Sequence, residues 1–176
     1  MRGESRAAGG DRQRYAPRAT IRHARPDEAA LLSALALRSK AYWGYDAAFM
    51  EACVAALTIV PESVEHSAFY VAQVGDEVVG FYGLGQVGDD ADLRYLFVEP
   101  AAIGLGYGSE LWRHAVETAG LLGFRRLRVE SDPYAEPFYL ARGAERIGEV
   151  PSEALPGRQL PLLVYDLAGA GATEPS

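Results

Sequence analysis

The chain has 176 residues, of which 49% are hydrophobic and 23% are charged, and its formal net charge is −7. This length suits one domain with a hydrophobic core, and the composition is typical of a soluble globular protein. The acidic balance argues against a nucleic-acid surface and is mildly consistent with a cationic substrate. A single cysteine, Cys53, excludes an internal disulfide and a cysteine-based zinc cluster, and three scattered histidines give a metal site little support. We therefore predict no metal.

Residues 1–17, rich in Arg, Gly and Ala, and residues 168–176, rich in Gly and Ala, are expected to form disordered tails. The first tail lacks the apolar segment of a signal peptide, and no apolar run approaches the length that spans a membrane. The sequence thus predicts a cytoplasmic protein without membrane attachment, with one domain over residues 18–167.

The first half of this domain begins with a strand and two helices. The strand is predicted over residues 19–24, and a helix over 26–40 begins with a proline and two acidic residues, as first turns often do. A second helix is predicted over 46–57. Trp43 and Tyr45 lie between the two helices, in an aromatic segment with a glycine hinge.

An antiparallel meander is predicted next. Strands over residues 69–74 and 77–84 are joined by a Gly-Asp pair that is typical of a hairpin. A central strand begins near Asp92 and ends at Pro100, and its alternating side chains predict that both of its faces are covered. The short connections indicate that these three strands are antiparallel.

Three glycines at alternate positions, Gly104, Gly106 and Gly108, open the helix that follows the central strand. The first N–H groups of a helix have no partner within it and carry the positive end of its dipole, and glycine lets an anion approach them closely. The pattern predicts a phosphate site, although such a turn could also simply close the strand onto the helix. The spacing excludes a dinucleotide loop, and Gly-Ser-Glu stands where a Walker loop needs Gly-Lys-Ser or Gly-Lys-Thr.

The end of the domain completes the sheet. A strand over residues 126–130 follows the helix and must therefore run parallel to the central strand. A short helix is predicted from Pro137 to about Gly143, and strands over 145–150 and 160–167 come last. The predicted fold class is a mixed α/β or α+β domain.

The segment from Ile103 to Gly108 resembles the acetyl-CoA loop of the GNAT family of N-acetyltransferases, whose pattern is Gln or Arg, two residues, Gly, any residue, then Gly or Ala. Ile103 departs from it, because the family usually has Gln or Arg there. The resemblance covers about residues 19–167. It implies the GNAT acyl-CoA N-acyltransferase fold, a mostly antiparallel sheet of about seven strands with two splayed parallel strands, flanked by about four helices.

The resemblance also implies where acetyl-CoA, the co-substrate, binds. In that family the pantetheine arm enters the gap between the splayed strands, and backbone amides of the glycine loop hold the pyrophosphate. The matching positions in this sequence are Leu96, Phe97, Val98, Ile103, Gly104, Leu105, Gly106, Tyr107, Gly108, Ser109, Asp132 and Phe138. Trp43 and Tyr45 would lie beside the acceptor groove, although they could instead be ordinary core residues.

A second motif, Phe138-Tyr139 followed by Gly143-Ala144, is similar to a family sequence with an aromatic-Tyr pair and then Gly-Phe. In the family, this tyrosine protonates the departing CoA thiolate, and the role is implied for Tyr139. The alternative is a tyrosine packed under the helix. Tyr134 is a weaker candidate for this general acid.

A general base must take a proton from the acceptor ammonium, because only the neutral amine is a nucleophile. Asp92 stands at the position of the glutamate that serves as base in some family members, and Glu99 is the second choice. Many relatives use a chain of waters instead.

The sequence therefore predicts an acetyl-CoA-dependent N-acetyltransferase that acts on a primary amine by direct attack in a ternary complex. Transfer through Cys53 is disfavoured, because no histidine nearby in the sequence would activate it. A small-molecule acceptor is slightly favoured over a protein acceptor, and a non-catalytic acyl-CoA binding or sensing module is the competing class. An exposed terminal strand could support a homodimer.

Overall fold

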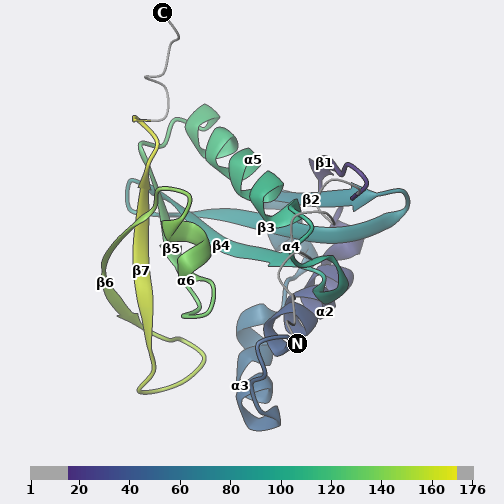
Figure 1. Ribbon diagram of the computed structural model, residues 1–176, viewed down its shortest axis with the longest axis horizontal. Coiled ribbons are helices and arrows are strands. Elements are labelled where there is room, and N and C mark those ends of the chain that lie inside the picture. The colour runs from purple at the N-terminus through teal and green to yellow at the C-terminus, as the bar shows by residue number, and fades with distance from the viewer. Residues whose placement is uncertain (1–15, 170–176) are drawn as a thin grey trace, which may run out of the picture.

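The computed structural model describes residues 16–169 and contains a seven-stranded sheet with the order β1-β2-β3-β4-β5-β7-β6 (Figure 1). The strands are β1 (Thr20–His23), β2 (Ala68–Val74), β3 (Glu77–Val87), β4 (Asp90–Val98), β5 (Arg126–Glu130), β6 (Glu145–Pro151) and β7 (Gln159–Asp166). Only β4 and β5 are parallel neighbours, and every other pair is antiparallel. The predicted mixed fold and its mostly antiparallel sheet are therefore confirmed.

Helices cover both faces of this sheet. They are α2 (Ala29–Ala41), α3 (Ala47–Leu57), α4 (Pro61–His66), α5 (Tyr107–Leu121) and α6 (Glu136–Leu140), with short 3₁₀ turns at Pro26–Glu28 and Pro100–Ala102. Helix α5 lies on one side of β2, β3 and β4, and helices α2 and α3 lie on the other (Figure 1). Within residues 16–169, none of the helices has the length and apolar character needed to cross a membrane.

Helix α4 was not predicted from the sequence. Its six residues are too few to display a helical period, so the apolar pattern carried no signal. A start signal was present, because Pro61 occupies the first helical position and Glu62 follows in the first turn. The start of α3 was predicted correctly: the Asp46 carboxylate caps it by accepting from the Phe49 N–H at 2.8 Å.

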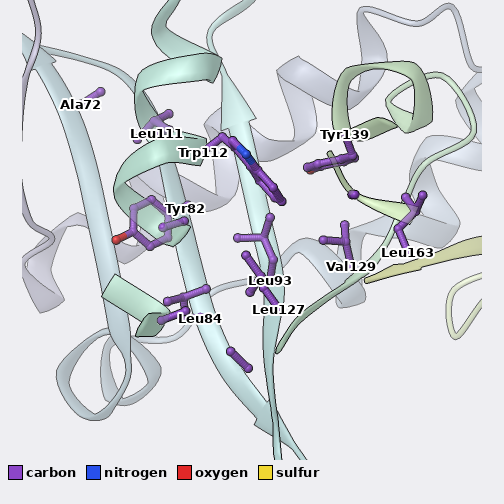
Figure 2. Packing of buried hydrophobic residues seen from close by; sticks show 14 residues of the cluster. Ala72, Tyr82, Leu84, Leu93, Leu111, Trp112, Leu127, Val129, Tyr139 and Leu163 are labelled. Atoms are coloured by element: carbon purple, nitrogen blue, oxygen red, sulfur yellow. The ribbon is translucent and has the colours of Figure 1, made fainter. Parts of the chain in front are cut away.

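Each face of the sheet has its own hydrophobic cluster. The cluster under α5 and α6 includes Tyr82, Leu111, Trp112 and Tyr139, and Figure 2 shows how these side chains lie above the strands. The cluster on the opposite face packs α2, α3 and α4 against β2 and β3, with Phe81 at its base. In the central strand β4, Leu93 belongs to the first cluster and Phe97 packs against the second, so both faces are covered, as the side-chain pattern predicted.

The parallel pair opens soon after it begins. Only two residue pairs, Ala91 with Leu127 and Asp92 with Arg128, join β4 to β5. Just beyond them the register between β3 and β4 shifts, so that Arg94 is the extra residue of a bulge. A bulge bends its strand and increases the local twist. The two strands thus diverge toward their C-terminal ends.

Beyond the bulge, the backbone of β4 presents hydrogen-bonding groups to this opening. The Glu99 N–H donates to the Val79 carbonyl at 2.8 Å, on the β3 side. Because successive peptide groups of a strand point to alternate sides, the groups of Phe97 also face β3. The backbone groups of Leu96 and Val98 therefore face the opening toward β5.

Candidate active site

A cavity of about 870 Å³ occupies the opening between β4 and β5 and extends between α2, α5, α6 and the loop 152–158. It brings together most of the residues that the sequence singled out: Trp43, Asp92, Leu96, Phe97, Val98, Ile103, Gly104, Gly106, Gly108, Ser109, Asp132, Phe138 and Tyr139. Four of the predicted residues, Tyr45, Glu99, Leu105 and Tyr107, do not line it. The glycine loop, the opened strands and the Tyr139 motif thus form one continuous site.

The N-terminus of α5 points its free amides into this cavity. Gly106 is the N-cap residue with a φ of 97°, a left-handed conformation that glycine adopts without strain. Within the described chain, no backbone carbonyl accepts from the N–H groups of residues 106–109. A Cβ at Gly108 would lie 3.4 Å from the Phe138 ring, so glycine keeps this first turn close to α6. The loop is suited to hold an anion.

The side chain of Tyr107 faces away from the cavity, although it belongs to the predicted cofactor loop. It is 3% exposed, and its hydroxyl donates to the Pro17 carbonyl at 2.8 Å. Tyr107 can therefore offer only its backbone to a ligand. Pro17 was assigned to the N-terminal tail; residues 1–15 of that predicted tail, and most of the C-terminal one, lie outside the described residues.

Tyr139 projects from α6 toward Trp112, with the two ring centroids 5.4 Å apart (Figure 2). The side chain is 6% exposed and lines the cavity, yet its hydroxyl forms no hydrogen bond with another described residue. Burial, reinforced by the charge of Asp132, raises the pKa of this phenol. The hydroxyl is thus kept protonated at neutral pH and is free to donate a proton to a ligand atom in the cavity.

Asp92 lies where the two parallel strands separate. Its carboxylate oxygens are 3.6 Å from Arg94 Nε and 3.6 Å from an Arg128 guanidinium nitrogen. Burial raises the pKa of the Asp92 carboxyl, and the charge of Glu130 adds to this, so that the two arginines compensate only in part. A carboxylate whose pKa moves toward neutrality is a better proton acceptor for a base-catalysed step.

Glu99, the second candidate base, lies outside the cavity lining. Its carboxylate pairs with the guanidinium of Arg38, which is half exposed on α2. This ion pair connects α2 to the end of β4. Glu99 therefore acts as a surface contact between two elements, and of the two carboxylates only Asp92 lines the cavity.

Asp132 is the centre of a polar cluster that ties three walls of the cavity together. Its carboxylate accepts from Lys40 at 2.9 Å and from the Tyr45 hydroxyl at 2.9 Å, and Arg158 lies 3.7 Å away. Burial acts to raise the pKa of Asp132, but the charge and hydrogen bond of Lys40 outweigh it and the pKa is lowered. Burial and the Asp132 carboxylate raise the pKa of Tyr45 to about 12. Tyr45 thus has a structural role, because its hydroxyl binds the Asp132 carboxylate in the cavity wall.

Trp43 lies at the mouth of the cavity, where it stacks on Tyr134. The two rings are nearly parallel, with an interplanar angle of 5° and centroids 5.4 Å apart. Both line the cavity and both are partly open to solvent, with exposed fractions of 39% and 55%. The pair spans from the segment after α2 to the loop after β5 and forms an aromatic rim of the cavity.

Several cavity residues had no signal in the sequence. Lys40 and Arg158 meet Asp132 from positions far away along the chain, and Arg142 reaches the first turn of α5 from the end of α6. Each looks locally like an ordinary surface cation. Within residues 16–169, no group of His, Cys, Asp and Glu side chains forms a metal site.

Solved structures share this architecture. The structure of PaiA N-acetyltransferase from Thermoplasma acidophilum, in complex with coenzyme A, aligns with a TM-score of 0.69 at 17% identity over 84% of this chain and 98% of that chain. A GCN5-related N-acetyltransferase from Rhodopseudomonas palustris aligns with a TM-score of 0.71 at 20% identity over 86% of this chain and 96% of that chain. The chain therefore has the fold of these N-acetyltransferase structures.

The sequence profile of the acetyltransferase (GNAT) family matches residues 33–144, which is more than half of the chain. The protein therefore belongs to the GNAT family of acetyltransferases. This confirms the resemblance drawn from the glycine loop and from the Tyr139 motif. No curated protein matches the sequence.

Proposed function

We propose that the protein is an acetyl-CoA-dependent N-acetyltransferase that transfers the acetyl group directly to the primary amine of a small molecule. The observation that carries the proposal is the single cavity that joins the free amides of α5 to Tyr139 and Asp92. Coenzyme A is bound in the PaiA structure named above, which supports the choice of donor. In this arrangement the CoA phosphates lie on the amides of residues 106–109, and the pantetheine arm pairs with Leu96 and Val98.

The residues around the opening then divide the reaction between them. The neutral amine attacks the thioester carbonyl carbon, and the N–H groups of β4 that face the opening stabilise the oxyanion. The tetrahedral intermediate collapses, the carbon–sulfur bond breaks, and the thiolate takes the proton of the Tyr139 hydroxyl. Asp92 accepts the proton that the amine nitrogen loses, directly or through a water.

The enclosure of the acceptor side favours a small molecule over a protein. The loop 152–158 forms one wall, and Arg158 holds it to the core by donating to the Tyr45 hydroxyl at 2.9 Å and by its contact with Asp132. The acceptor reaches the site past Trp43 and Tyr134. A cytoplasmic location and a homodimer stay predictions from the sequence.

Acetyl-CoA is expected to raise the unfolding temperature of the protein, whereas NAD and ATP are not. A ligand at ~100 times its dissociation constant stabilises a fold by about 2.7 kcal/mol, which for a domain of this size is a shift of roughly 5 °C or more. Differential scanning fluorimetry measures the shift. Release of free CoA that requires an added amine then separates the enzyme from a non-catalytic binding module, which would show the shift without turnover.

Asp92→Asn is expected to lower kcat by about 10²-fold, the lower end of what a general base contributes, because a water can still accept the proton. Since the base must be ionised, the wild-type rate should rise with pH through the elevated pKa of Asp92. Rates measured across pH 4–9 should show this rise in the wild type but not in the variant. If the wild type and the variant have equal rates and the same pH dependence, the base is a chain of waters instead.

A further inference from the structure

Arg142 holds its guanidinium at the first turn of α5, inside the cavity. One terminal nitrogen donates to the Phe138 carbonyl at 2.8 Å, and the other donates to the Ser109 hydroxyl. The guanidinium also lies over the Phe138 ring, 3.6 Å from its centroid. These three contacts fix the position of the charge, and they use only two of the five N–H donors that a guanidinium carries.

This charge has no counterion, unlike the other arginines that line the cavity. Arg94, Arg128 and Arg158 have carboxylate oxygens at 3.6, 2.7 and 3.7 Å, respectively. Among residues 16–169, no carboxylate lies within 4.0 Å of Arg142. The cavity therefore carries one uncompensated positive charge at a defined place.

The surroundings of Arg142 are unfavourable for a cation in the absence of a ligand. The side chain contacts the N-terminal turn of α5, which is the positive end of the helix dipole, where cations are destabilising. Burial also lowers the pKa of the guanidinium. Unfavourable placements of this kind occur mostly at functional sites. An anion between the guanidinium and the free amides of residues 106–109 would offset both the repulsion from the helix dipole and the cost of burying the charge.

We propose that Arg142 binds a phosphate group of the acyl-CoA donor and supplies the cation that the glycine loop lacks at Ile103. The inference rests on the proposed function, and it specifies which donor the site selects. Ile103 lines the same cavity but offers neither charge nor hydrogen bond. The fork of Arg142 can bind two phosphate oxygens at once, so donors without the CoA phosphates are bound less well.

The experiment compares Arg142→Met with Arg125→Met, which removes an equal charge from an exposed residue beyond the opposite end of α5, a helix about 22 Å long. Isothermal titration gives the affinities for CoA, dephospho-CoA and pantetheine. Arg142→Met is expected to weaken CoA binding about 10- to 100-fold, the loss of a charge-assisted contact, and to leave pantetheine binding unchanged. Arg125→Met should bind all three ligands as the wild type does.

The dephospho-CoA result locates the contact. An equal loss for CoA and dephospho-CoA assigns Arg142 to the pyrophosphate, and a loss for CoA alone assigns it to the 3′-phosphate; both support the proposal. Equal weakening of CoA and pantetheine would overturn it, because Arg142 would then act only by holding Phe138 in place. CoA affinity within about twofold of the Arg125→Met control would overturn it too. If Arg142→Met does not fold, Arg142→Gln takes its place, with the same expected losses.

Failure of the proposed function gives a different result. If the wild-type protein binds neither CoA nor pantetheine, the donor site itself is wrong and the role of Arg142 falls with it. If the wild type binds CoA and Arg142→Met binds it equally well, the proposed function stands and only the role of Arg142 is rejected. The wild-type titration is therefore the first arm to measure.

Discussion

Tyr139→Phe is expected to lower kcat for acetyl transfer by about 10²- to 10⁴-fold, the usual contribution of a general acid, with little change in stability. The hydroxyl has no hydrogen-bond partner among the described residues, so its removal leaves no polar group unpaired. Release of free CoA at saturating acetyl-CoA and amine measures the rate. Thermal unfolding of the variant, with and without acetyl-CoA, checks that the fold and the donor site are intact.

Tyr134→Phe is the matched control, because Tyr134 also lines the cavity but is 55% exposed. A large loss of kcat in that variant, with Tyr139→Phe near wild type, would exchange the roles of the two tyrosines.

The pH dependence of the wild-type rate gives a second test. An acid must be protonated, and burial raises the pKa of Tyr139 above its ordinary value of 10.0. The wild-type rate should therefore show no alkaline decline from this group below about pH 10.

Asp132→Ala is expected to lower the free energy of unfolding by about 3–5 kcal/mol, the usual effect of removing one partner from a buried ion pair. The change leaves Lys40 and Arg158 facing each other in the cavity wall without a carboxylate, and it leaves the Tyr45 hydroxyl without its acceptor. Urea denaturation at pH 7 gives the free energy. Since these contacts join three walls, the affinity for the acceptor amine should fall as well.

Asp90→Ala is the control for Asp132→Ala. Asp90 pairs with Arg126 through two contacts of 2.9 Å, but on the surface, so a far smaller loss is expected. A loss no larger than that of the control would contradict a stabilising role for the Asp132 cluster.

The stability that Asp132 contributes should depend on pH. Its pKa is lowered in the fold, so this contribution is present above its unfolded pKa near 4 and is lost as pH falls through the folded value. The difference in the free energy of unfolding between the wild type and Asp132→Ala should therefore shrink below about pH 4.

The sequence alone determined the features that depend on neighbouring residues. Asp46 caps α3 because its carboxylate reaches an amide three residues on, and glycine at position 106 permits the left-handed turn that starts α5. The parallel pairing of β4 with β5 followed from a helix between them, since short connections cannot join parallel strands. The opened sheet, the glycine loop and Tyr139 could all be placed from such local patterns and from the family motif.

Only the tertiary structure decided how charges are distributed in the site. Asp132 meets Lys40 across 92 positions of the chain, and Arg142 meets Ser109 across 33. The same folding turns Tyr107 away from the loop to which it belongs and draws Glu99 to the surface beside Arg38. Local periodicity reports which face of an element is buried, but it carries no information about which distant side chain arrives there. The sequence therefore determined the frame of the candidate site, whereas the packing of distant segments decided which side chains complete it.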